Sequence, residues 1–172
     1  MPSFSSPLTD RVQTAQLTIG HTLDNPTLVM EALVTPGVAL PGLTTRMDGH
    51  KELALVGDAV LKLALTLDGY EAKRSRGEPL ITPIPRKVCS SSISDLISKT
   101  LQTKASNVNL ALVGRRMGLD NLVIVNPSQA GMVSDKVMAN TVEALIGAVY
   151  MDSNSIDAVR PVLAAMGLDW PA

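Results

Sequence analysis

The run of residues 50–65 most constrains the fold, because it reads as one long, unbroken and largely apolar helix. Its apolar side chains recur at the spacing of one helical face: Leu53, Val56, Val60, Leu63, Ala64 and Leu67. Both ends of the run are nearly apolar all round, which predicts a helix buried on several sides. Gly57 interrupts it at a cost of about 1 kcal/mol relative to alanine. We therefore expect another backbone to approach the helix closely at Gly57.

The acidic residue Asp58 follows Gly57 and has two interpretations. On the protein surface it would form an ion pair with Lys62, which lies one helical turn later in the favourable order. Facing inward, it would form part of the wall of a functional site. Within this helix alone, the ion pair is the favoured interpretation.

The composition predicts one helical domain over residues 1–172. Hydrophobic residues make up 45% of the chain but aromatic residues only 2%, so the core must be aliphatic, which suits packed helices. The net charge of −1 argues against a protein that holds nucleic acid by overall positive charge. Any RNA binding must therefore rest on local patches or on metal ions.

The single cysteine, Cys89, excludes an internal disulfide and is expected to be a small buried apolar residue. It fits an intracellular protein, with the compartment left open. We see neither a secretory signal nor an apolar segment long enough to span a membrane, so no membrane partner is expected.

Periodicity and capping residues predict about seven helices and therefore an all-α fold. The expected helices cover residues 7–19, 26–34, 48–69, 86–103, 108–117, 135–151 and 154–166. The expected helix starts are Asn25 as an N-cap, the pair Ser106-Asn107, Ser134 before Asp135, and the pair Asn154-Ser155. Residues 70–85 are the least regular region. Residues 123–125 could be extended, but no second strand signal exists to pair with them.

The helix expected over residues 135–151 repeats the design of the first: an apolar body, a glycine at Gly147, and isolated polar groups. Asn140 and Glu143 are neighbours on one helical face. If the two helices cross, Asp58, Asn140 and Glu143 converge on one spot. Clustered oxygen atoms of this kind suit a hard divalent cation such as Mg²⁺.

These two helices resemble the motifs of the ribonuclease III endonuclease-domain family. Residues 53–61, LALVGDAVL, are similar to the family signature, and residues 137–152, which contain EALIGAVY, are similar to its second conserved helix. Weaker similarity covers residues 23–33 and 106–120. Order and spacing agree over about residues 15–165, nearly the whole chain.

The resemblance implies a helical endonuclease domain that forms a two-fold dimer through the signature helix and cuts double-stranded RNA with Mg²⁺. Four acidic side chains hold the metal in the family, and Asp58 and Glu143 stand at two of these positions. They are the candidate catalytic and metal-binding residues. The other two positions carry Ala54 and Asn140, and a further acidic position carries Lys51. Asn140 still offers a carbonyl oxygen and is the third candidate ligand, whereas Ala54 offers none.

Two other acidic residues, Glu52 and Glu78, differ in whether they can replace the missing ligands. Glu52 cannot substitute for Ala54, because it points about 160° away around the helix. Glu78 lies in the loop after the signature helix and is a further candidate. The chain ends at Ala172, so we also expect it to lack the double-stranded-RNA-binding domain that follows this fold in many relatives.

Three functions are compatible with this degenerate site. The favoured one is a ribonuclease III-like domain with impaired or lost cleavage, acting as a dimeric RNA- or protein-binding module. Some members, notably within mitochondrial ribosomes, keep the fold and lose the chemistry. The alternative is an active Mg²⁺-dependent endoribonuclease with an altered metal site. In the third, the motifs serve packing alone, and Asp58 pairs with Lys62 or Lys51.

A homodimer is expected under all three functions, on the strength of Gly57 and the apolar surplus of the signature helix. The RNA-binding residues, the RNA preference and any protein partner are not set by the sequence.

Overall fold

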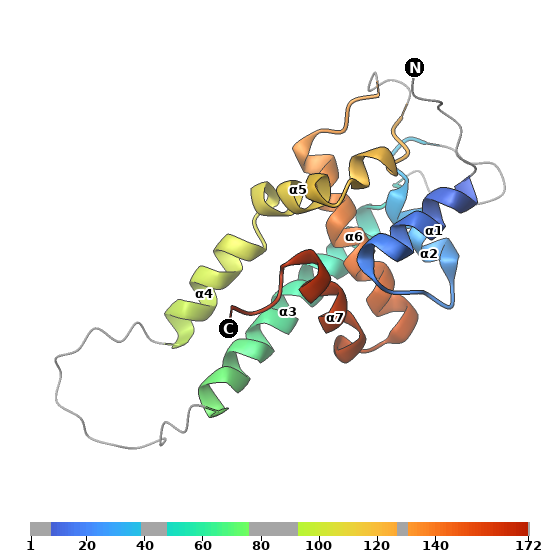
Figure 1. Cartoon of the computed structure of the whole chain (residues 1–172). Coiled ribbons are helices and arrows are strands. Elements are labelled where there is room, and N and C mark those ends of the chain that lie inside the picture. The colour runs from blue at the N-terminus through green and yellow to red at the C-terminus, as the bar shows by residue number, and fades with distance from the viewer. Residues whose placement is uncertain (1–7, 39–47, 76–92, 127–130, 172) are drawn as a thin grey trace, which may run out of the picture.

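The computed structural model describes residues 8–38, 48–75, 93–126 and 131–171, and within them the chain forms seven α-helices (Figure 1). Their bounds are α1 (Leu8–Ile19), α2 (Pro26–Leu33), α3 (Lys51–Ser75), α4 (Ile93–Lys104), α5 (Asn107–Arg116), α6 (Asp135–Ser153) and α7 (Ile156–Met166). A short 3-10 helix, η1 (Leu119–Asn121), follows α5. The predicted all-α fold is confirmed.

The predicted N-caps begin four of these helices. The side-chain oxygens of Asn25, Ser106, Ser134 and Ser155 each accept a hydrogen bond from a backbone N–H in the first turn of α2, α5, α6 and α7. Each such cap contributes about 1 kcal/mol to helix stability. These boundaries are set locally, which is why the sequence predicts them well.

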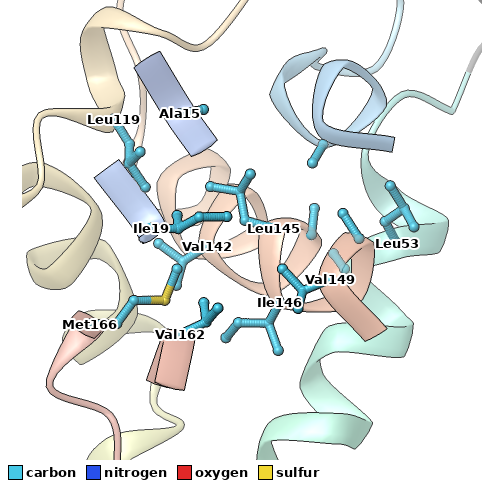
Figure 2. Packing of buried hydrophobic residues seen from close by; sticks show 14 of the residues in the cluster. Ala15, Ile19, Leu53, Leu119, Val142, Leu145, Ile146, Val149, Val162 and Met166 are labelled. Atoms are coloured by element: carbon cyan, nitrogen blue, oxygen red, sulfur yellow. The ribbon is translucent and has the colours of Figure 1, made fainter. Parts of the chain in front are cut away.

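Helix α6 lies at the centre of the core. Figure 2 shows its apolar residues Val142, Leu145, Ile146 and Val149, all buried, among Ile19 of α1, Leu53 of α3, and Val162 and Met166 of α7. Helix α3, by contrast, keeps an outward face that exposes Leu55, Leu63, Leu67 and Tyr70. The prediction that α3 is buried on several sides is therefore wrong, because α6 takes that central place.

Helices α3 and α6 touch through their backbones. A Cβ atom on Gly57 would lie 1.7 Å from the carbonyl oxygen of Glu143, and one on Gly147 would lie 2.2 Å from that of Leu53. The close approach expected at Gly57 is confirmed. Its partner, however, is α6 of the same chain, so Gly57 gives no support to a dimer and that part of the prediction is corrected.

Helix α3 runs beyond its predicted end at residue 69. A Cβ atom on Gly69 would lie 2.6 Å from Cη2 of Trp170 and 2.8 Å from Cγ1 of Ile97. Gly69 therefore does not end the helix, because its missing side chain makes room for the C-terminal segment and for α4. Residues 70–75, expected to be irregular, continue the helix.

Residues 123–125 do find a partner for pairing. Ile124 forms an isolated parallel bridge with Val34, the residue that follows α2. The backbone N–H of Ile124 donates to the Leu33 carbonyl at 2.8 Å, and that of Thr35 donates to the Ile124 carbonyl at 3.0 Å. No pattern in the sequence indicates this partner, because Val34 is predicted to be the last residue of a helix.

Two further polar features tie helix ends together. Arg115 contacts the Val133 carbonyl and Asp135 before and within the first turn of α6, and Arg116 contacts the Met166 carbonyl at the end of α7. The carboxylate of Asp152 accepts hydrogen bonds from two backbone N–H groups of the segment preceding α2. These residues have structural roles.

Two of the predicted residues, Cys89 and Glu78, lie outside the described residues. Among the helices that are described, none has the length and apolar character to cross a membrane.

Candidate functional site

An open pocket of about 480 Å³ lies where α3, α6 and the start of α5 meet. Helix α3 contributes Lys51, Ala54, Leu55, Asp58 and Lys62; α6 contributes Lys136, Asn140 and Glu143; and the α4–α5 junction contributes Ala105 and Asn107. All three predicted ligands, and Ala54 at the position predicted to be degenerate, thus line the same pocket. Glu52 is exposed and is not part of this lining.

Helical spacing and the glycine crossing together build this lining. Lys136, Asn140 and Glu143 follow one another at one-turn steps on α6, so they share a face. The backbone contact between Gly57 and the Glu143 carbonyl then brings the next residue, Asp58, to the same region. Convergence of the two helices was predicted from sequence.

Asp58 both forms an ion pair on its own helix and lines the pocket. Its Oδ2 atom lies 2.7 Å from Nζ of Lys62, which confirms the i,i+4 ion pair. Its side chain is 34% exposed and also lines the pocket. Lys51 instead contacts Asp48, with the two charged atoms 3.8 Å apart. The ammonium group of Lys62 is therefore already paired with Asp58, the one α3 carboxylate that lines the pocket.

Glu143 is only 8% exposed. Burial, and after it the negative charge of Asp58, raise the pKa of its carboxyl from 4.5 to about 7 against the opposing effect of Lys62. The group is consequently divided between its neutral and charged forms near neutral pH. The sequence identified this residue but not its altered acidity, which depends on the packing of α3 against α6.

This raised pKa predicts that Glu143→Gln stabilises the metal-free protein at high pH. Ionisation of Glu143 is disfavoured in the folded state, so its carboxyl lowers the free energy of unfolding once the pH is high enough to charge it. This loss of stability is absent below about pH 4.5, grows as pH rises, and is complete above about pH 7. At pH 8 we expect the variant to gain on the order of 2–3 kcal/mol. Urea unfolding in EDTA at pH 4 and pH 8 measures this gain, and equal stability of the two proteins at pH 8 would contradict it.

The pocket residues do not fit a four-carboxylate Mg²⁺ site. Only Asp58 and Glu143 can supply charged oxygen ligands here, because Ala54 presents a methyl group and Asn140 a neutral amide oxygen. Asp58 is bound by Lys62, and three lysines line the pocket together with the two carboxylates. Across the described residues, no group of three or more His, Cys, Asp or Glu side chains could hold a metal ion.

Sequence reasoning missed the two other polar residues of the lining, Lys136 and Asn107, as members of the site. The spacing of Lys136 from Asn140 and Glu143 placed it on their face and could have indicated its position. Asn107 gave no such signal, because its place depends on how α5 meets α3 and α6.

Comparison with known proteins bears on this fold and pocket. The family model for the ribonuclease III domain matches residues 51–154. Ribonuclease 3 of Oleidesulfovibrio alaskensis is 25% identical over 130 residues, which are 74% of this chain and 50% of that protein. Ribonuclease 3 of Leifsonia xyli is 34% identical over 121 residues, or 69% of this chain and 44% of that protein. The chain therefore spans about half the length of these curated relatives.

Two solved structures of the nuclease domain of ribonuclease III from Campylobacter jejuni share the fold. Their TM-scores are 0.64 and 0.65 at 15% identity, and they cover 94% and 93% of this chain. The region matched by the family model contains α3, α6 and every residue that lines the pocket. This region is more than half of the sequence, and the chain belongs to the ribonuclease III domain family.

Proposed function

We propose that this domain has lost, or nearly lost, metal-dependent RNA cleavage and acts as a dimeric RNA-binding module. The composition of the pocket carries this proposal. Ala54 and Asn140 stand where the resemblance implies acids, Lys62 binds Asp58, and Glu143 is partly protonated near neutral pH. Without a set of charged oxygens, a divalent cation is not held where it would activate water for attack on a phosphodiester.

The outer face of α3 supports the dimer. Leu55 and Tyr70 are 75% and 65% exposed, and Leu63 and Leu67 lie between them along the same face. An exposed apolar stripe of this length suits an interface with another protein surface. One of the two C. jejuni structures is known for structural flexibility in a region involved in dimer formation. Measurement of the mass in solution tests this, and a monomer would contradict it.

Incubation with long duplex RNA tests the loss of cleavage. We expect no product at high protein concentration in Mg²⁺ or Mn²⁺. A product that disappears in Glu143→Ala would overturn the proposal, because that variant removes the remaining acid of α6. A product that persists in Glu143→Ala identifies a contaminating nuclease, and the assay is then repeated on a preparation freed of it.

The second candidate function is an active endoribonuclease with an altered site. It is favoured by one observation: Asp58 and Glu143 face the same pocket, and the charge of one shifts the pKa of the other. It predicts cleavage that needs a divalent cation. The same duplex-RNA assay separates the two functions.

A purely packing role for the motifs is the third candidate, supported by the Asp58–Lys62 ion pair. It differs from the proposed function in predicting no affinity for RNA. A titration with duplex RNA at several salt concentrations distinguishes them, because binding to phosphates weakens steeply with salt.

A further inference from the structure

The pocket carries more lysines than carboxylates. Lys51 and Lys62 reach it from α3 and Lys136 from α6, against Asp58 and Glu143. The side chains of Lys51 and Lys62 are 56% and 51% exposed, so their ammonium groups are accessible from solvent. The mouth of the pocket is therefore more favourable to an anion than to a cation.

Two of these three lysines are available to a ligand. Lys62 is engaged by Asp58 at 2.7 Å. Lys51 makes only a long contact of 3.8 Å with the exposed Asp48, and Lys136 forms no ion pair within the described part of the chain. An incoming anion would therefore gain these two charges without breaking a short ion pair.

The neutral residues at the degenerate positions also favour an anion. A carboxylate only accepts hydrogen bonds, whereas the amide of Asn140 can donate one to a phosphate oxygen. Ala54 leaves a methyl group, only 5% exposed, where an acid would repel an anion. The same substitutions that remove metal ligands thus remove negative charge and add a donor.

We propose that this pocket binds a backbone phosphate of RNA through Lys51, Lys136 and Asn140, without a divalent cation. The inference rests on the proposed RNA-binding function and assigns the place where the RNA is held. A pocket volume of about 480 Å³ gives ample room for a phosphate and its sugar. Direct contact between ammonium groups and phosphate makes the binding salt-dependent.

Fluorescence-anisotropy titration of a short labelled RNA duplex, in EDTA and in Mg²⁺, tests this proposal. We expect the unchanged protein to bind equally in both buffers. The double variant Lys51→Gln, Lys136→Gln should bind about tenfold or more weakly, and the slope of log K against log salt should fall by roughly one for each lysine removed.

Lys99→Gln is the matched control, because Lys99 is exposed on α4 and lies outside the pocket. Its loss removes the same charge as either single variant and should leave the affinity nearly unchanged. Single Lys51→Gln and Lys136→Gln proteins complete the series. Thermal melting confirms that all the variants fold, as expected for exposed lysines.

Three results would overturn the inference. Loss of binding in EDTA would mean that a metal ion holds the RNA. An equal effect of Lys99→Gln and the pocket variants would mean that only the overall charge matters. Unchanged affinity of the double variant would place the RNA elsewhere and leave the proposed function standing. By contrast, a complete absence of RNA binding by the unchanged protein would refute the RNA-binding function itself.

Discussion

Replacement of Gly57 by alanine should destabilise the domain by about 4 kcal/mol or more, an exceptionally large effect for the addition of one methyl group. The new Cβ atom would lie 1.7 Å from the Glu143 carbonyl oxygen and 2.6 Å from its carbonyl carbon. Both are backbone atoms in the middle of α6, so relief requires the two helices to move apart. Folded domains have only about 5–15 kcal/mol of stability, and urea unfolding should show most of it lost.

Gly114→Ala is the matched control for this prediction. Gly114 also lies within a helix and faces α6, but a Cβ atom there would meet the side chain of Met138, 2.4 Å from its Sδ atom. A methionine side chain can change rotamer, so we expect a cost of less than about 2 kcal/mol. If Gly57→Ala unfolds at the same urea concentration as the unchanged protein, the backbone contact between α3 and α6 does not exist.

The same glycine shows what the sequence can and cannot predict about the fold. A glycine within an apolar helix indicates the close approach of another backbone, and that prediction is confirmed. It does not identify the partner: the backbone that approaches Gly57 belongs to α6 of the same chain, so the use of Gly57 as support for a dimer was wrong. Helix boundaries at Ser106 and Ser134 were predicted because capping is local. The continuation of α3 past Gly69 was missed, because it depends on Trp170 from the far end of the chain.

The candidate site likewise has features that the sequence predicts and features that only the folded structure shows. Helical spacing predicted that Asp58, Asn140 and Glu143 would converge if the two helices cross, and the pocket contains all three. The raised pKa of Glu143 depends on burial and on Asp58, and neither can be deduced from one helix alone. The approach of Lys136 to this pocket likewise requires the crossing of α3 and α6.

The double variant Ala54→Glu, Asn140→Asp should restore a divalent-cation site, because it places two new carboxylates beside Asp58 and Glu143. Without metal, four acids in one pocket repel each other, so we expect the variant to be less stable than the unchanged protein in EDTA. With Mg²⁺ at about one hundred times its dissociation constant, binding should raise the free energy of unfolding of the variant by about 2.7 kcal/mol. The unchanged protein should show no comparable stabilisation by Mg²⁺.

Cleavage of long duplex RNA should then appear in the double variant and not in the unchanged protein. The control variant Gln102→Glu, Asn121→Asp adds the same charge at exposed positions outside the pocket and should gain neither Mg²⁺ stabilisation nor activity. Mg²⁺ stabilisation without cleavage would mean that the metal site returns but Lys51 and Lys136 still hold RNA in an unreactive position. If the double variant gains neither property, the residues at positions 54 and 140 do not account for the proposed loss of metal binding.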